Sequence, residues 1–199
     1  MNQALAFVAQ GVMAFHVTRG GNRFTGCYID GSRAVLEGAG AAANIWLGGF
    51  ECCAGVPGVP HGILLLSDTI GPGLVITHSL FGGGTVFWQP QTAGLAAPRA
   101  VSGARIESNS FKGNGAGTRA TLTQAAAGGT SFTFDFCPLL VFPSIHHVAA
   151  LAVAAERGFP VAVARAPTGC SLVVETSEAL TGNITVTVDA SAEAGGEFV

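Results

Sequence analysis

The chain has 199 residues and a formal net charge of −3 at pH 7. Its 9 Lys and Arg residues form no stripe or cluster that could follow a phosphate backbone, so we expect no nucleic-acid partner. Only 11% of the residues are charged while 49% are apolar, which leaves little polar surface to keep a monomer soluble. We therefore expect an oligomer, with a compact monomer that has an apolar surface as the alternative.

The opening stretch, residues 4–17, is fairly apolar but lacks the features of a targeting signal. Gln10 and His16 interrupt it, and no basic segment precedes it. No run in the sequence has the length and apolar character of a membrane-spanning helix. We therefore expect neither a standard secretion signal nor insertion into a membrane.

Residues 24–113 carry one short phrase four times. An apolar residue is followed by a small or apolar residue at position four, an apolar residue at position six, and Gly or Ala at position eight. The copies begin 23, 29 and 30 residues apart. A period of this size is typical of solenoids, whose core forms when one unit stacks on the next. The four copies begin at Phe24, Leu47, Ile76 and Ile106.

Each repeat predicts at least two short strands. The fourth and sixth positions of the phrase are two residues apart, which is the spacing of side chains on one face of a strand. A third short run precedes some phrases, as at residues 44–46 and 74–75, and Gly-rich segments separate the strands. Residues 1–129 are therefore predicted to form a short right-handed parallel β-helix of about four to five coils. The second β-rich runs lie at residues 34–36, 63–66, 86–88 and 120–122.

Stacking of the coils predicts columns of equivalent side chains, because parallel strands lie about 4.8 Å apart. Ser79 and Asn109 are neighbours in an inward column, where we expect a short side-chain hydrogen-bond ladder instead of two orphaned polar groups. The alignment gives three inward columns: Phe24, Leu47, Ile76, Ile106; Cys27, Phe50, Ser79, Asn109; and Ile29, Cys52, Phe81, Phe111. It gives two outward columns: Tyr28, Glu51, Leu80, Ser110; and Asp30, Cys53, Gly82, Lys112.

Asp30 and Glu51 are the candidate catalytic pair of the outward columns. Cleavage of a glycosidic bond needs two carboxyl groups about 5 to 9.5 Å apart, and these two residues lie on adjacent coils, two positions out of step. The alternative is that both are solvated surface carboxylates, with Asp30 opening the turn at Gly31. The other acids of the coil are Glu37, Asp68 and Glu107.

Tyr28 and Trp88 are the candidate glycan-binding residues, because flat apolar rings suit the faces of sugars. Packing in the core or between subunits is the alternative for both rings. No cofactor motif is present. We expect no metal site, because neither His61 nor His78 has a second ligand at metal-binding spacing. The 5 cysteines have no metal spacing either and are expected to be free thiols of the core.

Beyond Gly128-Gly129 the pattern changes to alternating strands joined by short turns. Residues 130–191 are predicted to form a small antiparallel β-sandwich, in which 137–145 is a linker or edge crossing and the segment 147–155 could instead be a short helix. Residues 192–199 are expected to be a flexible tail. The predicted strands are 131–136, 147–155, 160–166, 171–176 and 184–189.

A stacked, Gly-rich β-coil followed by a small β-sandwich resembles the pectin-lyase-like tailspike and fibre proteins of tailed bacteriophages. The resemblance rests on the four phrases and on the region from residue 132 to 188, and it covers about residues 20–190. It implies a homotrimer with other virion proteins and a host-surface polysaccharide as partners. It also implies a place on the tail or spike of the virion after synthesis in the host cytoplasm.

The leading hypothesis from the sequence is therefore a structural and adhesive spike or fibre that recognises host-surface glycans. The outward columns offer little chemistry, which favours adhesion over catalysis. One alternative is a polysaccharide depolymerase, either a lyase or a glycoside hydrolase, with Asp30 and Glu51 as the pair to test. Another is a carbohydrate-binding module that has no connection with a virus.

Overall fold

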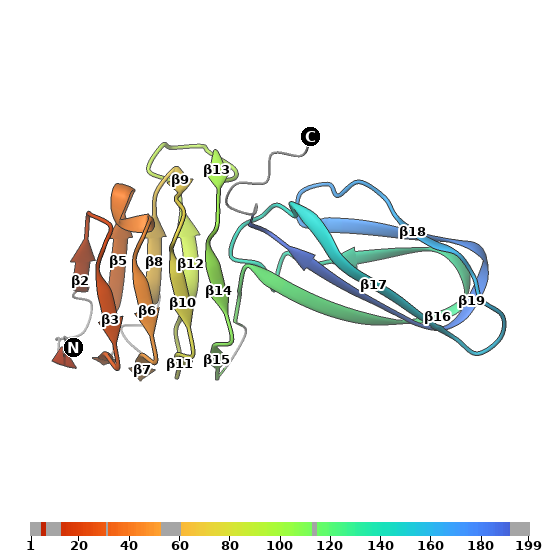
Figure 1. Ribbon diagram of the computed structural model, residues 1–199, viewed down its shortest axis with the longest axis horizontal. Helices are drawn as coiled ribbons and strands as arrows, with labels where there is room; N and C mark the ends of the chain where they lie inside the picture. Colours follow the sequence, from red (N-terminus) through yellow and green to blue (C-terminus); the bar gives the residue numbers. More distant parts are fainter. Residues whose placement is uncertain (1–4, 7–12, 31, 53–60, 113–114, 192–199) are drawn as a thin grey trace.

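The computed structural model describes residues 5–6, 13–30, 32–52, 61–112 and 115–191, with the backbone alone for residues 5–6, 30 and 50–52. The described chain is all-β apart from one turn of 3-10 helix, η1 (Gly38–Ala41), as the sequence predicted. In these ranges no helix is long and apolar enough to cross a lipid bilayer. Two regions follow one another along the chain: a stack of short parallel strands and an antiparallel sheet (Figure 1).

The stack is a parallel β-helix with three main faces. In each face a strand pairs with the equivalent strand one coil further on, so neighbours in a sheet are three or four elements apart in sequence. Figure 1 shows these strands side by side along the long axis of the molecule. The first face contains β1 (Leu5–Ala6), β4 (Tyr28–Asp30), β7 (Phe50–Cys52), β11 (Leu80–Phe81) and β15 (Ser110–Phe111). The second contains β2 (Met13–Val17), β5 (Arg33–Glu37), β8 (Gly62–Leu66) and β12 (Thr85–Gln89), and the third contains β3 (Arg23–Thr25), β6 (Ile45–Leu47), β10 (Val75–Thr77) and β14 (Arg105–Glu107). A short sheet of β9 (Thr69–Ile70) and β13 (Ala100–Val101) adds a further edge.

The repeated phrase spans a corner of the coil and is not a single strand, although the period-two spacing of its apolar residues predicts one. Its first residue lies in the third face, and its fourth to sixth residues turn into the first face. One residue at each corner has a left-handed backbone, with φ between 54° and 62°. Glycine adopts this conformation without strain, and two of the four corners use it. The four corner residues are Gly26, Gly48, His78 and Ser108.

The predicted columns are correct for three coils and wrong by one residue in the second. Ile76 pairs in register with Ile106 on one side and with Trp46 on the other, where Leu47 had been expected. Likewise Phe81 pairs with Glu51, where Cys52 had been expected. The physical reason is that 45–47 is a continuous apolar run, so its composition does not decide which of its residues enters the core.

Ser79 and Asn109 are neighbours in one column as predicted, but their side chains bond to backbone groups and not to each other as a side-chain ladder. The amide of Gly49 donates to Ser79 Oγ at 3.1 Å, and the amide of Ser79 donates to Asn109 Oδ1 at 3.0 Å. Asn109 Nδ2 completes the set by donating to the carbonyl of Ile76 at 2.9 Å. These bonds satisfy polar groups at the corner of three successive coils, where an unpaired amide would be costly.

The antiparallel region begins at β16 (Arg119–Asp135), about ten residues before the domain boundary that the sequence suggested. Residues 120–122, expected as a strand of the last coil, pair instead with β19 (Ser171–Asp189). β17 (His147–Ala155) and β18 (Ala162–Ala164) flank the two halves of β19. The segment 147–155 is thus a strand and not a helix.

β16 and β19 fold over together, so that one hydrogen-bonded sheet makes two layers (Figure 1). A straight strand of 17 residues would span about 56 Å. Instead, the amide of Leu140 donates to the carbonyl of Phe136, and the amide of Val141 donates to the carbonyl of Gly117, which brings the two ends of β16 together. The pairing shifts register near Gly128-Gly129, where the strands bend. The predicted sandwich is therefore a single sheet that doubles back, and the stretch between the predicted strands 171–176 and 184–189 lies inside β19.

The segment 137–145 is part of the core and not a simple linker. Leu140, Val141, Phe142 and Ile145 are all buried. They belong to the same hydrophobic cluster as Ile106 of the last coil and as the inner residues of the antiparallel sheet. The β-helix and the folded sheet therefore share one continuous apolar core.

Candidate functional site

Asp30 and Glu51, the predicted catalytic pair, are offset by one residue along the adjacent strands β4 and β7, where the sequence predicts an offset of two. Asp30 pairs with Cys52, and Ile29 pairs with Glu51, in the parallel strands β4 and β7. Successive residues of a strand alternate between faces, so a one-step offset does not favour a shared face. Glu51 also occupies the register position of Ile29 and Phe81, whose side chains are each 2% exposed. The catalytic role of Asp30 and Glu51 stays a prediction.

The two predicted glycan-binding rings lie in different settings. Trp88 packs against the hydrophobic core, and its indole Nε1 donates to the carbonyl of Ser67 at 2.7 Å. This placement matches the packing role that the sequence left open for Trp88. Tyr28 is half-buried on β4, in register with Phe50 of the next coil. Its glycan-binding role stays a prediction.

A polar cluster lies at one corner of the β-helix, where the sequence analysis singled out no site. Glu37 Oε2 pairs with His16 Nε2 at 2.5 Å, and Glu37 Oε1 accepts a hydrogen bond from Gln91 Nε2 at 3.2 Å. Asp68 Oδ1 accepts from the backbone amides of Gln91 and Thr92, each at 2.8 Å. The cluster therefore ties the loop after β12 to two earlier coils.

Asp68 is fixed as an ionised acceptor in this cluster. The Thr92 hydroxyl donates to its second carboxylate oxygen. The hydrogen bonds from the side chain and backbone of Thr92 hold the pKa of Asp68 below its ordinary value, with smaller effects from Gln91 and Arg99. A carboxylate that is stabilised in its charged form is a poor general acid. We therefore assign Asp68 a structural role.

An open cleft of about 310 Å³ lies where the last coil meets the antiparallel sheet. β14 and the corner after it form one wall, and the start of β16 forms the other. Phe111, Ala116 and Leu139 are among its apolar lining residues. Its volume falls in the range of about 300 to 1,000 Å³ that is common for small-molecule sites. The polar lining residues are Glu107, Ser108, Asn109, Arg119 and Thr121.

Glycine is required on the apolar side of this cleft. The Phe111 ring stacks on Phe81, with centroids 4.9 Å apart and planes 11° apart. A β-carbon at Gly115 would lie 1.9 Å from the Phe111 ring, so only glycine lets the loop cover the ring this closely. The ring is thus held between Phe81 and the Gly115 backbone, and it forms a fixed wall of the cleft.

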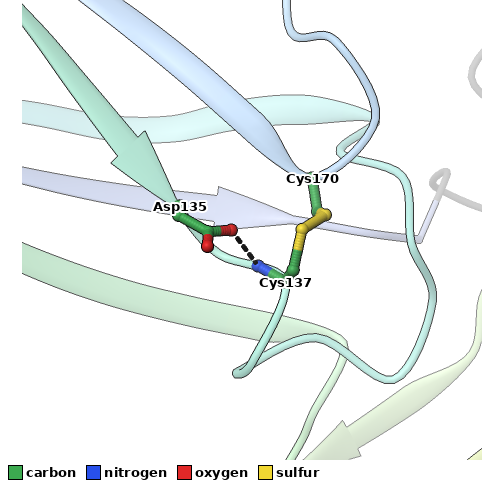
Figure 2. The surroundings of a disulfide bond; sticks show 3 residues. All are labelled: Asp135, Cys137 and Cys170. Carbon is green, nitrogen blue, oxygen red and sulfur yellow. Dashed lines mark hydrogen bonds between the residues drawn. A yellow bond between two sulfur atoms is a disulfide. The ribbon is translucent and has the colours of Figure 1, made fainter.

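A disulfide bond joins Cys137 to Cys170, which corrects the expectation that all cysteines are free thiols (Figure 2). Cys27 is buried and unpaired, as expected. Asp135 lies beside the disulfide, and its Oδ1 accepts from the amide of Cys137 at 2.9 Å. The three residues are close enough to be metal ligands, but sulfur atoms joined in a disulfide offer no thiolate to a metal. We assign this group a structural role.

Neither the cleft nor the place of Arg119 in its lining follows from the sequence patterns. Glu107 was noted only as a remaining acid of the coil, and Arg119 lies in a segment that had been assigned to a further coil. No spacing in the sequence indicates that Glu107 and Arg119 line the same cleft, because the cleft exists only where the stack ends and the sheet begins. The Gly-rich segment around Gly115 indicated a tight turn from the sequence, and the structure places the Gly115 backbone close against the Phe111 ring.

Comparison with known proteins gives a partial similarity to a plant enzyme. A segment of 63 residues is 46% identical to Polygalacturonase QRT3 of Arabidopsis thaliana. The segment makes up 31% of this chain and 13% of the plant protein, so the chain spans only a small part of that relative's length. No protein-family model matches the chain. The similarity agrees with the pectin-lyase-like part of the resemblance seen in the sequence and adds nothing for the bacteriophage part.

Proposed function

We propose that this chain binds a uronate-containing polysaccharide outside the cell. The observation that carries the proposal is that a chain folded as a parallel β-helix is 46% identical to a polygalacturonase over 63 residues. Coils stacked about 4.8 Å apart offer a rigid, repeated surface along which a linear polymer can lie. The Cys137–Cys170 disulfide supports this location, because disulfides persist in oxidising environments.

Binding is favoured over cleavage because the described carboxylates of the coil already have partners. Asp68 is held by Gln91 and Thr92, Glu37 pairs with His16, and Glu107 pairs with Arg105. A glycosidase needs one protonated and one ionised carboxyl group with room for the sugar between them. These engaged carboxylates do not form such a pair.

Affinity electrophoresis in gels that contain a polysaccharide tests the proposal. We expect polygalacturonate in the gel to retard the chain, and neutral galactan to leave its mobility unchanged. A bovine serum albumin lane serves as the non-binding control. Equal mobility in all gels would contradict the proposal.

Depolymerisation is the second candidate, favoured by the name of the plant relative. Asp30 and Glu51, the pair predicted from the sequence, are then the pair to test. The measurement is the release of reducing ends from polygalacturonate. Release that the substitution Glu51→Gln abolishes would favour the enzyme, and no release over many hours would favour binding alone.

A homotrimeric virion spike is the third candidate, favoured by the exposed apolar side chain of Leu80. Leu80 is 45% exposed at an outward position of the first face, where a neighbouring chain could cover it. Light scattering at micromolar concentration tests this assembly. A mass near 60 kDa would be three times the chain mass of 20.0 kDa and would support a trimer. A mass near 20 kDa would contradict it.

A further inference from the structure

The cleft between the last coil and the folded sheet contains polar groups that no other part of the described chain uses. Arg119 is exposed, lines the cleft, and makes no ion pair with any described residue. Asp189 lies opposite it on β19 but forms no ion pair with it, and Asp189 Oδ1 accepts from the amide and hydroxyl of Ser191, each at 2.8 Å. The Arg119 guanidinium is therefore available to a ligand.

The opposite wall supplies hydrogen-bond acceptors. Both bonds from Arg105 go to Oε1 of Glu107, from Nε at 3.0 Å and from a terminal guanidinium nitrogen. Oε2 of Glu107 and the hydroxyl of Ser108 have no hydrogen-bond partner among the described atoms. Glu107 is paired with Arg105, which lies outside the lining, so Arg119 is the one lining cation and has no ion pair among the described residues.

We propose that this cleft binds a single hexuronate unit of the polysaccharide, an inference that rests on the proposed function above. Arg119 donates to the sugar carboxylate, because a planar guanidinium matches a carboxylate with two parallel hydrogen bonds. Glu107 Oε2 accepts from a ring hydroxyl, and Ser108 provides a second polar contact. Phe111 and Leu139 contribute the apolar wall. A neutral hexose would lack the group that pairs with Arg119.

Isothermal titration calorimetry with trigalacturonate, and affinity electrophoresis with polygalacturonate, test this site. We expect the substitution Arg119→Gln to weaken binding of both ligands about tenfold, because a charge-assisted pair contributes enough for such a change. Arg157→Gln is the matched control, because Arg157 is exposed just after β17, lies outside the lining of the cleft, and makes no ion pair with another described residue. It should change the affinity less than twofold. Equal thermal midpoints would show that both variants are folded.

The outcomes separate the site from the function. If the wild-type chain binds polygalacturonate and Arg119→Gln binds it equally well, the cleft assignment is overturned while the proposed function stands. Equal affinity for trigalacturonate and for a neutral galactose trisaccharide would overturn recognition of the carboxylate. If the wild-type chain binds neither ligand, the proposed function falls and the site falls with it.

Discussion

Replacing both Cys137 and Cys170 by alanine is expected to lower the free energy of unfolding by about 3 to 4 kcal/mol. The disulfide joins residues 33 positions apart and closes a loop that contains β17 and β18. Without it, the unfolded chain gains the conformational freedom of that loop, and the gain grows with loop length. For a chain of this size the thermal midpoint should fall by about 10 °C. Calorimetry of the wild type and the double variant measures both quantities.

Reduction provides the matched control for this prediction. A reducing agent should lower the thermal midpoint of the wild type to that of the double alanine variant and should leave the variant unchanged. Cys27 has no partner, so it contributes nothing to the difference. If the wild type were insensitive to reduction, the disulfide would not be formed in solution.

The substitution Ile76→Ala is expected to cost about 3 kcal/mol of stability. Ile76 is 0% exposed and lies in the centre of an inward column, in register with Trp46 and Ile106. Truncation removes buried apolar surface and leaves a cavity, and such changes cost about 2 to 5 kcal/mol. The cavity would lie between neighbouring coils, so it should weaken the whole stack.

Leu80→Ala is the matched control for Ile76→Ala, because it removes a similar side chain from an outward position of the same coil. Its cost in the isolated chain should stay below about 0.5 kcal/mol. Urea denaturation of the two variants under identical conditions gives the comparison. Equal costs for Ile76 and Leu80 would show that the inward and outward faces have been assigned wrongly.

The coil could be predicted from the sequence because its apolar residues recur with a regular period. That period does not fix the register within an apolar run such as Ile45-Trp46-Leu47, where each residue is a plausible core residue. The structure selects Trp46, since Gly48 then takes the left-handed corner and Gly49 donates to Ser79. A register error of one residue was enough to move Glu51 from an outward column to the position of Ile29 and Phe81.

The second half shows a different limit of sequence patterns. Gly128-Gly129 indicated a boundary between domains, yet the hydrogen-bonded ladder continues past it and only bends there. Strand patterns describe local alternation, whereas the doubling back of β16 and β19 depends on contacts with residues 136–141. The disulfide was missed for a similar reason, because sequence alone does not reveal which cysteines meet.

The most direct test of the central claim is the affinity of the chain for polygalacturonate as its carboxylates are progressively methyl-esterified. Esterification removes the charge that the proposed site recognises while keeping the polymer backbone. We expect retardation in affinity electrophoresis to be strongest for the unesterified polymer and to disappear for the fully esterified one. Retardation that is independent of esterification, or absent throughout, would contradict the account.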